Sequence, residues 1–112
     1  MPHLKKNISM QDIDSFAQQL GKEFQPERVI LFGSFAHGTP TQDSDVDILV
    51  IMPFHGRTAP HAAAIRCRLR PPFPLDLLIR TPEKIRERVQ LGDPFIQDIL
   101  EWGKVLYEAP HN

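Results

Sequence analysis

The chain of 112 residues carries 13 lysine and arginine residues against 14 aspartate and glutamate residues, a formal net charge of −1 at pH 7. This length suits one modest hydrophobic core, so we expect a single domain over residues 1–112. A hydrophobic content of 41% favours a folded globule in spite of 11 prolines. The balanced charge argues against a nonspecific nucleic-acid-binding protein.

Compartment and membrane signals point to a cytoplasmic protein. The single cysteine, Cys67, excludes an internal disulfide framework and suits a reducing compartment. Residues 1–6 lack the apolar core of a signal peptide, and no apolar run is long enough to span a membrane. We therefore expect no membrane association.

The first expected element is an amphipathic helix over residues 10–24, with Ser9 as its N-cap. Its apolar residues recur at helical spacing, and we interpret them as core only: Ile13, Phe16, Ala17 and Leu20.

A short apolar run over residues 28–32 is typical of a buried strand and ends at Gly33. Gly33 can adopt backbone conformations closed to other residues, and Ser34 can cap a short helix. Backbone N–H groups at such a strand-to-helix turn favour a bound phosphate. A Gly-Ser pair alone is weak evidence, because most such pairs are only tight turns.

The next strand begins with two carboxylates. Asp45 and Asp47 project to one face of an extended strand, and the residues that follow, to Ile51, are apolar on both faces. Two like charges at the entrance of a core need compensation, which a hard divalent cation supplies. Alternatively, Ser44 and Asp45 are turn residues and Asp47 is a solvated edge residue.

A third carboxylate, Asp76, begins another buried-strand pattern over residues 75–79. An isolated acid in such a run needs a partner or a metal. If this strand lies beside the second one, Asp76 reaches the same point as Asp45 and Asp47. If the first two strands are antiparallel, Gly33 joins them. The predicted site then has the equipment for metal-assisted chemistry on a nucleoside triphosphate.

Residues 37–44 are expected to form a surface loop, with His37 facing solvent and phosphate contact as its alternative role. A connector over residues 53–60 leads to a helix over residues 61–69. The scattered histidines argue against a zinc site. The region from Arg57 to Arg70 is rich in arginine, which we interpret as a solvated helix face; a patch for a polyphosphate, an RNA acceptor or an acidic partner is the alternative.

Two further helices are expected, one from the N-cap Thr81 to about Leu91 and one over residues 94–102. We interpret Phe95 and Trp102 as core, although their apolar stripe could instead meet another chain.

Taken together, the motif resembles the nucleotidyltransferase superfamily that includes DNA polymerase beta, and within it the minimal nucleotidyltransferase (MNT) domains. The residues that carry the resemblance are Gly33, Ser34, Ala36, Gly38, Ser44, Asp45, Asp47 and the distal Asp76. Residues 103–108 also resemble the last strand of the family, so the resemblance covers nearly the whole chain. It implies an α/β (α+β) fold with a small mixed β-sheet and helices packed on it. Many members carry basic residues where this chain has Phe35 and His37.

The resemblance implies that Asp45, Asp47 and Asp76 are catalytic and bind Mg²⁺, with two ions expected. Gly33, Ser34 and Ser44 would bind the nucleotide. The implied reaction transfers a nucleoside monophosphate, with AMP from ATP as the first choice, to a hydroxyl acceptor and releases pyrophosphate.

Larger enzymes of this kind carry an additional domain, for which this chain has no room. The resemblance therefore implies a partner in trans, a helical HEPN protein, with this chain as the antitoxin of a HEPN/MNT toxin-antitoxin pair. The alternative is a binding module that neutralises its partner by contact, with weak or no catalysis. The base preference, the acceptor and a homo-oligomeric state stay open.

Overall fold

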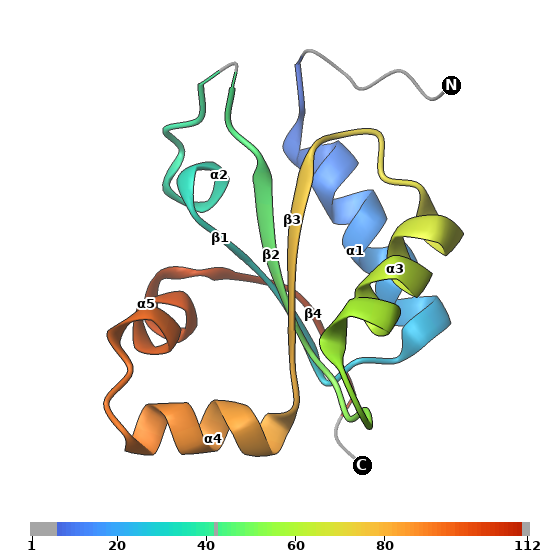
Figure 1. Cartoon of the computed structure of the whole chain (residues 1–112). Coiled ribbons are helices and arrows are strands. Elements are labelled where there is room, and N and C mark those ends of the chain that lie inside the picture. The colour runs from blue at the N-terminus through green and yellow to red at the C-terminus, as the bar shows by residue number, and fades with distance from the viewer. Residues whose placement is uncertain (1–6, 42, 111–112) are drawn as a thin grey trace.

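The computed structural model describes residues 7–41 and 43–110. The first six residues, in which we expect no signal peptide, lie outside the described residues. The elements follow in the order α1 (Met10–Phe24), β1 (Arg28–Phe32), α2 (Ser34–His37), β2 (Val46–Ile51), α3 (Thr58–Leu69), β3 (Leu75–Arg80), α4 (Pro82–Gln90), α5 (Pro94–Trp102) and β4 (Lys104–Glu108) (Figure 1).

The strands form one mixed sheet in the order β3-β2-β1-β4. β1 is antiparallel to both of its neighbours, β2 and β4, whereas β2 and β3 are parallel. The expected mixed sheet is thus confirmed. The antiparallel pairing of β1 and β2 meets the condition under which Gly33 joins the carboxylates.

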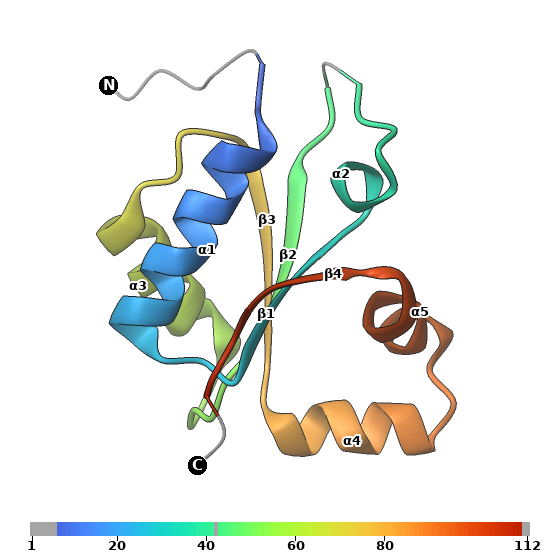
Figure 2. The same ribbon diagram turned by 180° about the vertical axis from the view of Figure 1, so that it is seen from behind.

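Helices cover both faces of the sheet, with α1 and α3 on one side and α4 and α5 on the other (Figures 1 and 2). Val46, Ile48 and Val50 of β2 are buried toward α1 and α3, while Leu49 and Ile51 are buried toward α4 and α5. The central strand is therefore apolar on both faces, as its sequence pattern indicates. The core under α4 and α5 is the smaller one; its buried members are Ile30, Leu49, Ile51, Ile85, Ile96 and Ile99.

The first helix has the predicted bounds, and a reciprocal pair of hydrogen bonds caps its N-terminus. Ser9 Oγ accepts a hydrogen bond from the Asp12 N–H at 3.1 Å, and the Asp12 carboxylate accepts one from the Ser9 N–H at 3.1 Å. This capping box satisfies two backbone donors that the helix leaves unpaired. The four apolar residues predicted as core are buried.

Two sequence-based expectations were wrong. The third helix begins at Thr58, three residues before the predicted start at His61. Pro60 lies in its first turn, where a missing N–H breaks no helical hydrogen bond. Phe95 and Trp102 are not core, since 51% of Phe95 and 64% of Trp102 is exposed.

These two aromatic residues lie at the margins of the apolar stripe of α5. Within that stripe, Ile96 and Ile99 face the sheet. Phe95 keeps an edge-to-face contact with Phe32 on β1, with ring centroids 5.8 Å apart. Within residues 7–41 and 43–110, we find no helix that is both long and apolar enough to cross a membrane.

Candidate functional site

The predicted site residues lie where three strands meet at one edge of the sheet. Asp47, the second residue of β2, pairs with Phe32 on β1 and with Asp76 on β3. Gly33 directly follows Phe32, and Asp45 directly precedes β2. The end of β1 and the starts of β2 and β3 thus bring together residues that are up to 43 positions apart in the sequence.

Asp47 and Asp76 share one face of the sheet. Because side chains alternate, Asp47 projects to the same side as Leu49, and its partner Asp76 to the same side as Leu78. Asp45, just before β2, is close enough for its charge to act on Asp47. This is the side on which α4 and α5 pack farther along the strands (Figure 1). The two helices leave the site open, since Asp45 and Asp76 are exposed and Asp47 is half-buried.

The electrostatics of the site centre on Asp47. Partial burial raises the pKa of the Asp47 carboxyl above its ordinary value, and the negative charges of Asp76 and Asp45 raise it further. The ionised form is thus disfavoured by desolvation and by repulsion from the other two carboxylates. A cation bound between these groups would remove both penalties.

The turn after β1 packs directly on this carboxylate. Gly33 has φ +74° and ψ −156°, and a Cβ atom built on it would overlap Asp47 Oδ2 and lie 3.1 Å from Asp47 Cγ. Only glycine allows the chain to turn this close to Asp47. The Gly33 carbonyl accepts hydrogen bonds from the Ala36 and His37 N–H groups at 3.1 and 3.2 Å, which closes the single turn of α2.

Ser34 is half-buried at the first position of α2, where backbone N–H groups have no helical acceptor. Ser44 organises the loop that delivers Asp45. Its Oγ accepts a hydrogen bond from the Thr41 N–H at 2.9 Å, and its own N–H donates to the Thr41 carbonyl at 3.1 Å. Nucleotide contact by Ser34 and Ser44 stays a prediction.

The donor set suits a hard divalent cation in its chemistry, because carboxylate oxygens are the preferred ligands of such ions. Asp47 and Asp76 are direct partners in a parallel pair, on strands about 4.8 Å apart. Among the described residues, no three aspartate, glutamate, histidine or cysteine side chains surround a common point closely enough to hold a metal. Rotation of the side chains would be needed to close this set on an ion.

A cavity of about 200 Å³ adjoins the Gly33 turn. Gly33 and His37 line one side of it, and Phe95, Asp98 and Trp102 of α5 line the other. No sequence pattern indicated that α5 would face the turn, because its apolar stripe predicted only that the helix packs on something. His37 is exposed beside this cavity, as its expected solvent contact requires.

The arginine-rich segment is not part of this site. α3 covers the opposite face of the sheet, and Arg68 on it pairs with Glu23 on α1, with Nε and Oε1 2.8 Å apart. This contact supports the interpretation of the segment as a helix face, with one of its arginines tying two helices together.

Comparison with known proteins agrees with this arrangement. The sequence model of a family described as "Nucleotidyltransferase domain" matches residues 13–107, so the chain belongs to that family. A comparison with curated proteins gives no match. The crystal structure of a candidate nucleotidyltransferase from Sulfolobus solfataricus is similar in fold: the TM-score is 0.51 at 16% sequence identity, and the match covers 88% of this chain and 79% of that one.

The family and the fold place the chain in the polymerase beta-like nucleotidyltransferase superfamily, which confirms the resemblance drawn from the motif. Such domains transfer nucleoside monophosphates and generally use a nucleoside triphosphate and a divalent metal.

Proposed function

We propose that this chain uses Mg²⁺ to transfer AMP from ATP to a hydroxyl group of an acceptor protein. The observation that carries the proposal is the meeting of the Gly33 turn with Asp45, Asp47 and Asp76 at one edge of the sheet. The Gly33 turn lies on one side of Asp47, where it would bind the phosphates of ATP. The exposed Asp76 lies on the other side, where the acceptor hydroxyl would approach.

In this proposal Asp45, Asp47 and Asp76 would hold the Mg²⁺, which would act as a Lewis acid and offset charge on the phosphate oxygens. Gly33 and Ser34 hold the terminal phosphates through backbone N–H groups and the serine hydroxyl. Asp76, on the open side of the site, accepts the proton of the attacking hydroxyl. A bond forms between the acceptor oxygen and the α-phosphorus, the bond to the β-phosphate breaks, and pyrophosphate leaves.

The acceptor protein that we propose is a helical HEPN-type partner, with this chain as its antitoxin. The exposed Phe95 and Trp102 on α5 support a protein contact near the site, because large apolar side chains at a surface often mark an interface. The same observation favours the second candidate function, neutralisation of the partner by contact alone.

The test uses ATP labelled at the α-phosphate, with Mg²⁺, in extracts from cells that produce the chain or its Asp47→Asn variant. We expect a labelled, protease-sensitive species with the unaltered chain and at least about 100-fold less label with Asp47→Asn. Asp14→Asn, an exposed site on α1 with the same charge change, should transfer normally. ATP labelled at the γ-phosphate excludes a kinase.

Equal labelling by the chain and by Asp47→Asn would refute transfer at this site. The two candidate functions are separated with the partner present. Catalytic neutralisation fails in Asp47→Asn although the partner still binds, whereas neutralisation by contact survives the substitution.

A further inference from the structure

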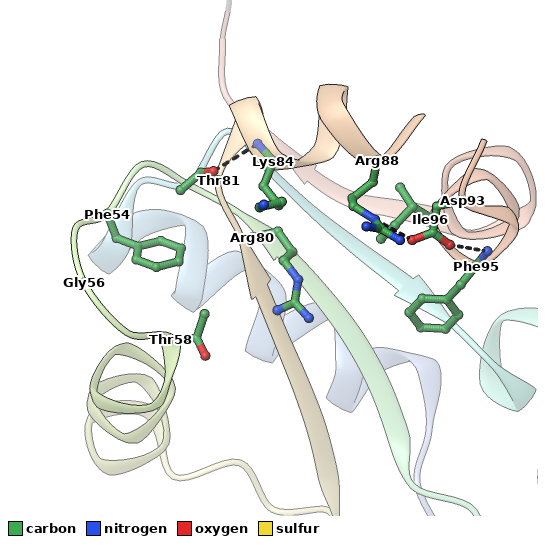
Figure 3. Close-up of a pocket in the computed structure, with 10 residues that line it drawn as sticks. All are labelled: Phe54, Gly56, Thr58, Arg80, Thr81, Lys84, Arg88, Asp93, Phe95 and Ile96. Atoms are coloured by element: carbon green, nitrogen blue, oxygen red, sulfur yellow. Dashed lines mark hydrogen bonds and ion pairs between the residues drawn. The ribbon is translucent and has the colours of Figure 1, made fainter. Parts of the chain in front are cut away.

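A second and larger cavity, of about 670 Å³, lies at the other end of the same sheet face (Figure 3). Its walls come from three parts of the chain: the junction of β3 and α4, the segment that leads into α3, and the start of α5. None of the three carboxylates and no part of the Gly33 turn lines it. Arg80 and Asp76 lie on the same face of β3, four residues or about 13 Å apart.

The lining of this cavity is basic although the chain as a whole carries a charge of −1. Arg80, Lys84 and Arg88 contribute three cations against one carboxylate, Asp93. Arg88 is already paired, because its Nε lies 2.9 Å from Asp93 Oδ2. Lys84 pairs with Glu87 at 3.1 Å, but both side chains are more than half exposed, and such a contact is weak.

Arg80 is the uncompensated charge. Its NH1 group donates to the carbonyl of Ile79 at 2.7 Å, and within the described part of the chain no carboxylate lies within ion-pair distance of it. Arg80 is half-buried at the end of β3, and Figure 3 shows its guanidinium group extending into the space between α4 and Thr58. A half-buried guanidinium with donors left over favours an anionic ligand.

Neighbouring groups add donors for an anion. Thr81 Oγ1 accepts a hydrogen bond from the Lys84 N–H at 3.1 Å, so the hydroxyl proton of Thr81 remains free to donate. Thr58 brings a second hydroxyl, and Phe54 forms an apolar wall beside it. A phosphoryl group has three oxygens that can accept hydrogen bonds from the Arg80 guanidinium, the Lys84 ammonium and the threonine hydroxyls.

We propose that this Arg80 cavity binds a small phosphorylated molecule, with its phosphoryl oxygens on Arg80 and Lys84 and its apolar part against Phe54. The volume lies within the range usual for small-molecule sites. The cavity is separate from the carboxylate edge, and the proposal does not depend on transfer activity there.

The test measures binding of pyrophosphate to the purified full chain by calorimetry, with a chelator present so that the carboxylates repel the probe. We expect saturable binding with a Kd of about 1 mM or tighter. Arg80→Gln should weaken it about tenfold, as loss of a charged hydrogen bond implies. Arg86→Gln makes the same charge change on the neighbouring helix α4 but lies outside the cavity, and should bind normally.

Asp47→Asn should also bind normally, which separates this site from the transfer site. Lys84→Gln, at an exposed position that tolerates substitution, provides a second variant if Arg80→Gln does not fold. AMP as a second probe tests the Phe54 contact. Tighter binding of AMP than of pyrophosphate supports a phosphorylated molecule with its apolar part on Phe54, whereas equal or weaker binding overturns that contact in favour of inorganic phosphate.

Three results would overturn the proposal. The first is the absence of saturable pyrophosphate binding, and the second is an equal loss of affinity in Arg86→Gln and Arg80→Gln. The third is that pyrophosphate shifts the amide NMR signals of Gly33 and Ser34 and leaves those of Arg80, Thr81 and Lys84 unchanged.

Discussion

At the scale of single residues, Gly33 and Asp47 determine each other's environment. The positive φ of Gly33 and its contact with Asp47 leave no space for a side chain, so the turn can approach the carboxylate only with glycine in this position. The raised pKa of Asp47 shows that ionisation of this carboxyl costs free energy at this place in the fold. Both features are expected of a binding site built ahead of its ligand.

Gly33→Ala should therefore damage function more than stability. The added Cβ must displace the Asp47 carboxylate, and we expect a loss of transfer of at least about tenfold. Alanine in this backbone conformation, with φ +74° and ψ −156°, should lower the free energy of unfolding by about 1–3 kcal/mol. Urea unfolding and the α-label assay measure the two effects.

Gly92→Ala is the matched control, since Gly92 has φ +77° and a Cβ atom built on it would meet no other atom within 4 Å. Gly92→Ala places an alanine at positive φ without a steric clash and should retain nucleotidyl transfer. Full activity in Gly33→Ala would show that Asp47 does not need its present position.

At the scale of elements, Asp93 joins α4 to α5. Its Oδ1 accepts a hydrogen bond from the Phe95 N–H at 3.0 Å and caps α5, while its Oδ2 accepts one from Arg88 Nε at 2.9 Å. The Arg88 hydrogen bond is the main cause of a lowered pKa of the Asp93 carboxyl, with the Phe95 and Ile96 N–H groups as smaller causes. The contact links the last turn of α4 to the first turn of α5.

Asp93→Asn should show the pH dependence of this contact, because asparagine keeps the cap and removes the charge. A lowered pKa in the folded state stabilises the fold above the ordinary aspartate pKa of about 3.9. That stabilisation is lost as pH falls through this value toward the lower pKa of the folded state. We expect the variant to melt at a lower temperature than the unaltered chain at pH 7.

The difference in Tm should shrink as the solution is acidified below about pH 4. Thermal melts of both proteins across this range provide the measurement. A difference that does not change with pH would mean that the Asp93 charge contributes nothing to stability.

The elements also show where sequence patterns suffice. The apolar runs of β2 and β3 predicted buried strands with carboxylates at their starts. The sequence left open whether the two strands are neighbours, and the strand register places Asp47 beside Asp76. The exposure of Phe95 and Trp102 on α5 could not be predicted in this way. Periodicity identified a stripe, but how far a small sheet covers that stripe depends on the sheet's width, and Phe95 and Trp102 lie beyond it.

At the scale of the whole molecule, one face of the sheet carries two regions of opposite charge, one at each end of the strands. Acidic residues gather where β2 and β3 begin, and basic ones where β3 ends and α4 follows. The acidic group could be predicted because Asp47 and Asp76 each interrupt an apolar run and Asp45 lies two residues before Asp47. The basic cavity could not, because Phe54, Thr58, Arg80 and Lys84 carry no shared local pattern and meet only through the fold.

The proposal that Asp47 and Asp76 share a divalent cation is tested most directly by Mn²⁺ titration followed by electron paramagnetic resonance, with a non-hydrolysable ATP analogue present. Asp47→Asn and Asp76→Asn should each weaken Mn²⁺ binding at least about tenfold, or about 1.4 kcal/mol, while Asp14→Asn binds as the unaltered chain does. Unchanged Mn²⁺ affinity in both site variants would contradict a metal site at this edge of the sheet.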